Sequence, residues 1–103
     1  MPKRVDANQA EIVEALRDIG AGVAVTSDLG NGFADIVVGW QGNNWLFEIK
    51  DFSKPPSARR LTPAEKKFHD TWRVHGQIDV ITSFDDALQY LTRYASPADV
   101  PPF

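Results

Sequence analysis

Hydrophobic residues recur with helical spacing at the start of the chain and with strand spacing in its middle. Ile12, Val13, Leu16 and Ile19 fall on one side of a helix, so the segment from residue 8 to residue 19 predicts an amphipathic helix that ends at Gly20. Runs rich in β-branched and aromatic residues follow. They predict three strands, over residues 23–26, 33–40 and 45–51.

A tight turn joins the second and third of these strands and sets their pairing. Gly42-Asn43 is a two-residue hairpin signal of type II′, and it predicts that Asp35 lies opposite Lys50, with Glu48 on the same face. The opposite face is expected to be a nearly unbroken apolar surface that helices cover. It contains Ala34, Ile36, Val38, Trp40, Trp45, Phe47 and Ile49.

The second half of the chain returns to helical spacing. Thr62-Pro63-Ala64-Glu65 combines an N-cap, a proline at the first helical position and a glutamate at the third, and the predicted helix has Ala64, Phe68 and Trp72 as its buried stripe. A strand over residues 78–81 and a final helix after Ser83 follow. The fold class predicted is α/β, of the α+β type with a mixed sheet, in the order α-β-β-β-α-β-α. One domain spans residues 1–95, before a proline-rich, flexible tail over 96–103.

Length and composition narrow the class of protein. A chain of 103 residues with 43% hydrophobic residues is long enough for one small globular domain. The absence of cysteine excludes disulfides and thiolate metal sites and favours a reducing cytoplasm. No apolar stretch approaches about 20 residues, so neither a membrane span nor a secretory signal is expected.

The net charge of −3 conceals an uneven distribution. Residues 50–73 contain seven basic residues against three acidic ones, a local charge of +4, while the remainder of the chain carries −7. Because nucleic-acid affinity depends on local neutralisation of phosphates, this segment predicts DNA contacts. An ordinary solvated charge run is the alternative. The candidate DNA-binding residues are Lys54, Arg59, Arg60, Lys66 and Lys67.

The hairpin carboxylates are the main candidates for chemistry. As diagonal neighbours with Cα atoms roughly 7–8 Å apart, Asp35 and Glu48 can converge on one cation, and Lys50 shares their face. The alternative is a solvated polar face with Lys50 as a cross-strand ion-pair partner. On the first helix, Glu11 lies at the margin of the apolar stripe and is the candidate for an inward-facing carboxylate, or it forms a capping box with Asn8.

Two further side chains lie one turn apart on the second predicted helix. Glu65 and His69 are spaced i, i+4, so they can reach substrate or metal together. The alternative is a capping glutamate beside a surface histidine. The three tryptophans, Trp40, Trp45 and Trp72, are expected in the core rather than as platforms for base stacking.

With these residues in this order of elements, the sequence resembles the PD-(D/E)XK nuclease superfamily, which has a restriction-endonuclease-like core. The signature is matched by Ala34-Asp35 and, thirteen residues later, by Glu48-Ile49-Lys50, with Glu11 on the leading helix. The segments 61–65, 68–72 and 80–83, with Gly76, are similar to the VRR-NUC branch and to small phage nucleases and Holliday-junction resolvases. Ala34 replaces the proline of the motif, and Glu65 replaces a frequent glutamine.

The resemblance implies a metal-dependent, structure-selective DNA endonuclease that acts as a homodimer on branched DNA, in a bacterial or phage-infected cell. Mg²⁺ or Mn²⁺ would be held by Asp35, Glu48, the Ile49 backbone carbonyl and Glu11, and Lys50 would orient or deprotonate the attacking water. The alternative is a catalytically silent nucleic-acid-binding module that keeps the nuclease fold.

Overall fold

The computed structural model describes residues 7–93, which form three α-helices, one short 3₁₀-helix and four strands. In chain order these are α1 (Gln9–Asp18), β1 (Gly22–Val25), β2 (Ile36–Trp40), β3 (Asn43–Ile49), η1 (Pro56–Arg59), α2 (Pro63–Arg73), β4 (Ile78–Ile81) and α3 (Phe84–Thr92). The predicted α+β class is confirmed, and the tail over residues 96–103 lies outside the described residues.

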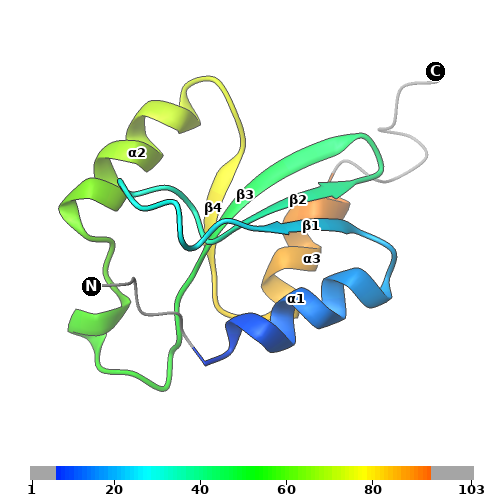
Figure 1. Ribbon diagram of the computed structural model, residues 1–103, viewed down its shortest axis with the longest axis horizontal. Coiled ribbons are helices and arrows are strands. Elements are labelled where there is room, and N and C mark those ends of the chain that lie inside the picture. The colour runs from blue at the N-terminus through cyan, green and yellow to red at the C-terminus, as the bar shows by residue number, and fades with distance from the viewer. Residues whose placement is uncertain (1–6, 94–103) are drawn as a thin grey trace.

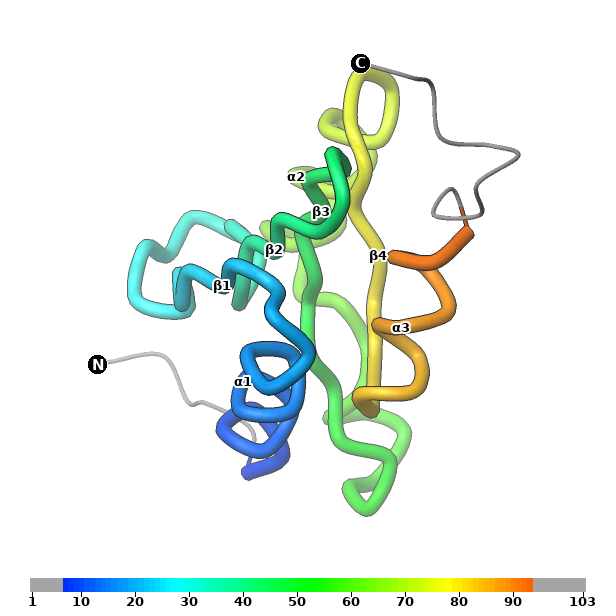
Figure 2. The backbone as a smooth tube through the Cα atoms, turned by 90° about the vertical axis from the view of Figure 1, so that its right-hand side faces the viewer, coloured from blue at the N-terminus to red at the C-terminus, as the bar shows by residue number. Residues whose placement is uncertain are grey.

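The four strands form one mixed sheet in the order β1-β2-β3-β4. The pairs β1·β2 and β2·β3 are antiparallel, whereas β4 returns parallel to β3 after crossing over through α2. Helices cover both faces of the sheet, α1 and α3 on one side and α2 on the other (Figures 1 and 2). Both faces of the central strand β3 are therefore buried.

The face beneath α1 and α3 holds the larger hydrophobic core. Alternate residues of β3 point to it, and Phe47, which is fully buried, packs with Trp45 at a ring separation of 6.1 Å. The predicted stripe of α1 contributes Ile12, Val13 and Leu16, and α3 contributes Ala87 and Leu91. At about 25 cal/mol per Å² of buried apolar surface, this core is the main source of stability.

The hairpin turn lies one residue earlier than predicted. Gln41 and Gly42 are its central residues, and both have positive φ angles, 47° and 86°, which is the type I′ geometry that matches the twist of paired strands. Trp40 consequently lies opposite Asn43, and Ile36 lies opposite Phe47. The predicted register, with Asp35 opposite Lys50, is wrong by two residues, but a shift of two residues leaves the side chains within β2 and β3 on their predicted faces.

Two other local predictions are also wrong. Ala34 packs with Leu46 and Ile78 on the α2 side, because β2 begins only at Ile36 and the alternation does not extend back to residue 34. The Asn8 side chain does not cap α1: its amide donates to the carbonyl oxygens of Lys50 and Thr82, each at 3.1 Å, and so ties α1 to the ends of β3 and β4.

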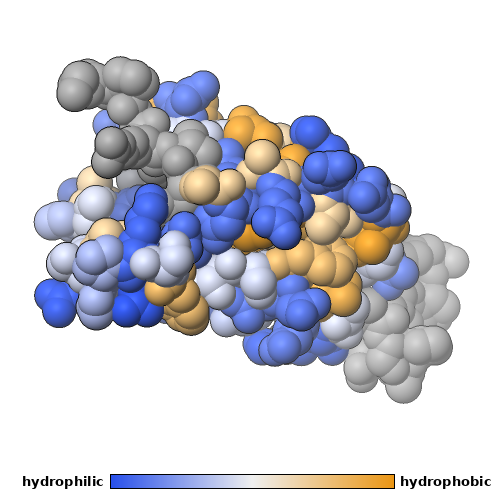
Figure 3. Space-filling model, turned by 90° about the horizontal axis from the view of Figure 1, so that it is seen from below, coloured by the Kyte–Doolittle hydropathy of each residue, from blue (hydrophilic) through white to orange (hydrophobic). Residues whose placement is uncertain are grey.

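The surface seen in Figure 3 is largely hydrophilic, with smaller hydrophobic areas between the polar residues. Among the helices of residues 7–93, none is long and apolar enough to cross a membrane.

Candidate active site

The face of the sheet beneath α2 carries a buried lysine held between two carboxylates. Lys50 is 9% exposed, and its Nζ lies 3.1 Å from Glu65 Oε1 and 3.7 Å from Glu48 Oε1. Glu48 is 1% exposed and Glu65 4%. The alternative of a solvated polar face is therefore wrong, because α2 covers the charged side of the hairpin.

The first turn of α2 fixes Glu65 in this cluster. Its backbone N–H donates to Thr62 Oγ1 at 3.1 Å, and the Thr62 N–H donates to Glu65 Oε1 at 2.8 Å, which completes the predicted capping box. The same Glu65 oxygen accepts the hydrogen bond from Lys50. Glu65 therefore caps the helix, as one of the two alternatives predicts, and it also lies in the charged cluster with Glu48 and Lys50.

A glycine brings the loop before Asp35 against the same helical turn. Gly32 has a φ of +80°, and a Cβ atom there would lie 2.3 Å from the backbone oxygen of Ala64. Any larger residue would push the loop away from the start of α2. The chain thus holds the Asp35 segment and the Glu65 turn close together.

Asp35 reaches across the hairpin to β3. The residue is 4% exposed, and its Oδ2 accepts a hydrogen bond of 2.8 Å from the backbone N–H of Ile49, between Glu48 and Lys50. Its own backbone is tied to both neighbouring strands, donating to Phe47 O and accepting from Thr26 N. This carboxylate is rigidly placed, and the Ile49 peptide that the sequence proposes as a ligand lies directly beside it.

The ionisation of Glu65 reflects its partners. Burial alone would raise the pKa of this carboxyl, but hydrogen bonds from Glu48 and from the Thr62 backbone, together with the Lys50 charge, lower the pKa to about 2. Glu65 is therefore ionised at neutral pH and stabilises the Lys50 ammonium.

His69 lies one helical turn after Glu65 and is 1% exposed, so the expected surface histidine is wrong. Burial and the Arg73 guanidinium lower its pKa, which leaves the imidazole neutral at pH 7. The predicted apolar stripe of α2 is also wrong. Ala64 is exposed and Trp72 is 38% exposed, whereas Glu65 and His69 are the buried residues of this helix.

The remaining predicted residues lie outside the cluster. Glu11 is exposed on α1, so the expectation that it faces inward is wrong, and Gln9 is the buried polar residue at this end of the helix. The reason is that Ile12, Val13 and Leu16 set the buried side of α1 and leave Glu11 beyond its margin.

The basic residues form a discontinuous set around η1 and α2. Arg59 is half-buried, and its guanidinium carbon lies 5.1 Å from the centre of the Phe52 ring. Arg60 and Lys67 are exposed and Lys54 is half-buried. Lys66 is exposed and paired with Asp70 at 2.8 Å.

The chemistry of the cluster fits a divalent cation. Asp35, Glu48 and Glu65 are buried carboxyl side chains gathered near the end of β3, and carboxylate oxygens are the ligands that hard divalent cations prefer. Residues 7–93 contain no group of three or more acidic, histidine or cysteine side chains already arranged to hold a metal. Mg²⁺ needs only one or two carboxylates, since water and substrate phosphates complete its shell, and Asp35 with Glu48 supplies that number.

Comparison of the chain with models of known families, with curated proteins and with solved structures gave no match. What the molecule does is therefore inferred from the chemistry of this cluster and from the resemblance in its motifs.

Proposed function

We propose that this domain is a metal-dependent nuclease of the PD-(D/E)XK type, with a restriction-endonuclease-like core, that hydrolyses phosphodiester bonds in branched DNA. The observation that carries the proposal is the buried Lys50 between Glu48 and Glu65, with Asp35 on the neighbouring strand segment. Asp35, Glu48 and Lys50 match the acid, acid and lysine positions of the motif that the sequence resembles, and all three are buried in or next to the strands of the β2–β3 hairpin.

Burying these charges is costly. Desolvating each ion costs several kcal/mol, and replacing a buried ion pair by apolar side chains of similar size is often neutral or stabilising. The opposite face of the same sheet shows that this chain can build an apolar surface. A charged cluster maintained at such a cost supports a catalytic role.

Asp35 and Glu48, with the Ile49 carbonyl, would hold Mg²⁺ or Mn²⁺ in the working enzyme. Bound there, the metal supplies a Lewis acid for the phosphoryl oxygens and a hydroxide-like nucleophile at neutral pH. The Asp35 side chain is already oriented by the Ile49 N–H at 2.8 Å. This hydrogen bond fixes the orientation of the carboxylate, and therefore also the position of its other oxygen.

Lys50 would act on the proton of the attacking water and on the charge that develops at the phosphate. The 3.1 Å hydrogen bond to Glu65 holds the ammonium within 3.7 Å of Glu48, one of the two metal ligands in this proposal. Glu65 is then a positioning residue, because it acts through Lys50 and through the cap of α2.

The basic residues of the η1 and α2 region would bind the DNA backbone, in particular Arg59 and Arg60. A homodimer would supply the paired cuts that a four-way junction needs, since one chain contributes one cluster. These assignments, and a place in a bacterial or phage-infected cell, follow from the resemblance.

The test is to incubate the purified protein with labelled four-way junction, flap, linear duplex and single strand, in Mg²⁺ or in EDTA, beside Glu48→Gln. We expect cleavage that EDTA abolishes and that the variant lowers by at least ~100-fold. DNA binding without cleavage in Mg²⁺ or Mn²⁺ would instead favour the silent binding module. If the protein neither binds nor cleaves any of these DNAs, the cluster has no nuclease role.

A further inference from the structure

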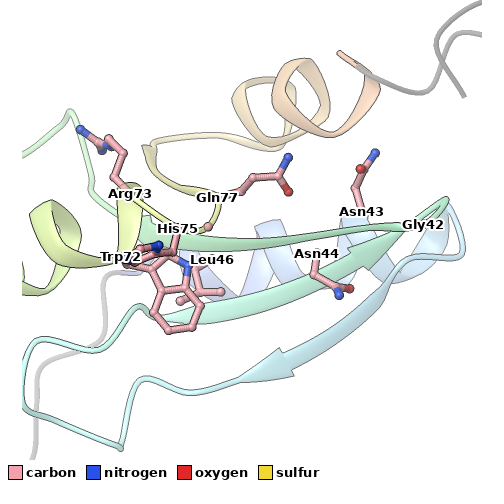
Figure 4. Close-up of a pocket in the computed structure, with 9 residues that line it drawn as sticks. Gly42, Asn43, Asn44, Leu46, Trp72, Arg73, His75 and Gln77 are labelled. Carbon is pink, nitrogen blue, oxygen red and sulfur yellow. The ribbon is translucent and has the colours of Figure 1, made fainter.

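A pocket opens between the tip of the β2–β3 hairpin and the end of α2, on the far side of His69 from Lys50. Its volume is about 600 Å³, in the range of small-molecule sites, and its lining includes Asn44, Leu46, Trp72, His75 and Gly76. In Figure 4 the Trp72 ring lies next to Leu46, and Asn44 extends from the same strand.

Trp72 is one of the exposed aromatic side chains of the domain, at 38%. Its indole is held by Phe68, whose ring stacks at 5.5 Å and 21°, and by Phe33, edge-on at 6.5 Å and 74°. A ring fixed in this way and still open to solvent provides a rigid stacking surface at low entropic cost. The expectation that Trp72 belongs to the core is therefore wrong.

Gly76 leaves space beside this ring. A Cβ atom at this position would lie 2.6 Å from Trp72 Nε1 and 3.1 Å from Cδ1, so the glycine allows the indole to sit where it does. The lining of the pocket includes the polar residues Asn44 and His75, and among the residues that the structure describes it contains no aspartate or glutamate. Arg73 also borders the pocket, but its guanidinium is turned away from Trp72 in Figure 4 and donates to the Ile78 carbonyl oxygen at 3.4 Å. An aromatic surface with an amide and an imidazole beside it matches a nucleobase.

The pocket lies on the same face of β3 as the candidate active site. Asn44, Leu46 and Glu48 are alternate residues of this strand, so they share one face, and Leu46 lies about 7 Å along the strand from Glu48. Asn44 lies about 13 Å from Glu48 by the same spacing. A few nucleotides of one DNA strand span this distance.

We propose that this pocket binds an unpaired nucleobase of the DNA substrate, stacked on Trp72, while a nearby phosphate of the same strand lies at the acidic cluster. The nature of the ligand rests on the proposed nuclease function. The pocket would then select DNA with unpaired bases, which flaps, overhangs and single strands offer and which a continuous duplex or a fully paired four-way junction does not.

The test crosses a protein substitution with a change in the DNA. A labelled duplex with a short oligothymidine overhang is bound in EDTA, and one overhang residue at a time is replaced by an abasic site. At one position the abasic site should weaken binding of the wild-type protein by about tenfold, since stacking is lost. Trp72→Ala should bind both DNAs with the same, weaker affinity.

Two further variants keep the result interpretable. Val74 is 74% exposed beside Trp72 but outside the pocket, so Val74→Ala should retain the full abasic effect. Gly76→Ala keeps Trp72 but pushes against its ring, so it should reduce the abasic effect even if Trp72→Ala folds poorly.

The outcomes separate this inference from the nuclease proposal. An abasic effect that is equal in the wild type, Trp72→Ala and Gly76→Ala would overturn the pocket while Mg²⁺-dependent cleavage could stand. An abasic effect that depends on Trp72, without cleavage in any metal, would uphold the pocket and overturn the nuclease. A protein that binds no DNA at all would overturn both.

Discussion

On the face of the sheet that α1 and α3 cover, the buried cluster is apolar, from Ile12 to Leu91. On the opposite face, α2 lies over Glu48 and Lys50 and contributes its own buried residues Glu65 and His69. Both faces are drawn from the same strands, and alternate residues of β3 supply each of them. The first face buries apolar side chains, as a protein core usually does, whereas the second buries charged groups that are costly to desolvate. The comparison shows that the larger apolar cluster and the buried charges lie on opposite sides of one sheet.

The division has a physical consequence for how each face responds to substitution. Loss of volume on the α1 and α3 side should cost stability in proportion to the cavity created. Loss of charge on the α2 side should change activity first, and its effect on stability should depend on which charge is removed.

Phe47→Ala should produce the largest loss of stability. The side chain is fully buried beneath α1 and α3, and its removal should cost about 3–5 kcal/mol, which would unfold much of a domain of this size. Urea unfolding followed by circular dichroism measures the loss. Val37→Ala, on the half-buried α2 side of β2, is the matched control and should cost far less. Equal losses at the two positions would break the comparison.

Two substitutions within the charged cluster should shift stability in opposite directions. Lys50→Met removes the ammonium that pairs with Glu48 and Glu65 inside the protein, and should cost about 3 kcal/mol. Glu48→Gln leaves Lys50 paired with Glu65 and removes one of two neighbouring carboxylates, so it should stabilise by roughly 0.5–2 kcal/mol while abolishing cleavage. Urea midpoints at pH 7 measure both. A loss of stability in Glu48→Gln would mean that this carboxylate serves the fold.

The Glu65 carboxylate should make stability depend on pH in an acidic window. Its pKa falls from an ordinary value of 4.5 to about 2 in the folded protein, so its contribution is fully present above pH 4.5 and is lost as the pH falls toward 2. The difference in unfolding free energy between wild type and Glu65→Gln should shrink by at most about 3 kcal/mol across this window. Asp70→Asn, which breaks the exposed pair with Lys66, should show a much smaller change. A pH-independent difference would contradict the proposed ionisation of Glu65.

The smallest effect concerns the DNA backbone. Replacing Arg59 and Arg60 together by glutamine should weaken DNA binding and lower the slope of log K against log salt by about 1 to 2. Arg93, the C-cap residue of α3, is the matched control. Its guanidinium also stacks on an aromatic ring, at 5.1 Å from the centre of Tyr90, but α3 lies on the other side of the sheet. Filter binding at several salt concentrations measures both. An unchanged slope would remove Arg59 and Arg60 from the interface.

The strands show which parts of this fold can be predicted from the sequence. Side chains alternate with a period of two, so the pattern of β3 assigns Phe47 to one face and Glu48 to the other without knowledge of the partner strand. The register depends on one turn, and Gln41-Gly42 and Gly42-Asn43 are both acceptable two-residue turns by composition. The sequence therefore predicts the faces of the residues within β2 and β3 correctly, whereas the predicted pairing of the two strands differs from the structure by two residues.

The second helix shows what a hydrophobic pattern misses. The apolar pattern predicts that Ala64 is buried, whereas the structure leaves it exposed. Glu65 is buried instead, because its partner Lys50 directly follows β3, fifteen residues earlier in the chain. The spacing of Glu65 and His69 did place them on one helical face, which was the available signal for the cluster. Neither the burial of His69 nor the exposure of Trp72 is encoded in helical spacing alone.

The first helix shows the limit of capping signals. Asn8 and Glu11 match the capping-box pattern, but the Asn8 amide binds carbonyls at residues 50 and 82, and Glu11 remains in solvent. Long-range hydrogen bonds of this kind compete with local caps and leave no trace in a short window of sequence.

The most direct test of a catalytic face is the cleavage rate of Asp35→Asn, measured on a four-way junction in Mg²⁺ with the urea midpoint of the same preparation. Asparagine keeps an oxygen that can accept the 2.8 Å hydrogen bond from the Ile49 N–H, so the substitution removes the charge and retains the structural contact. We predict a rate at least ~100-fold lower with an unchanged midpoint. Cleavage at the wild-type rate would contradict the account and make Asp35 a structural residue.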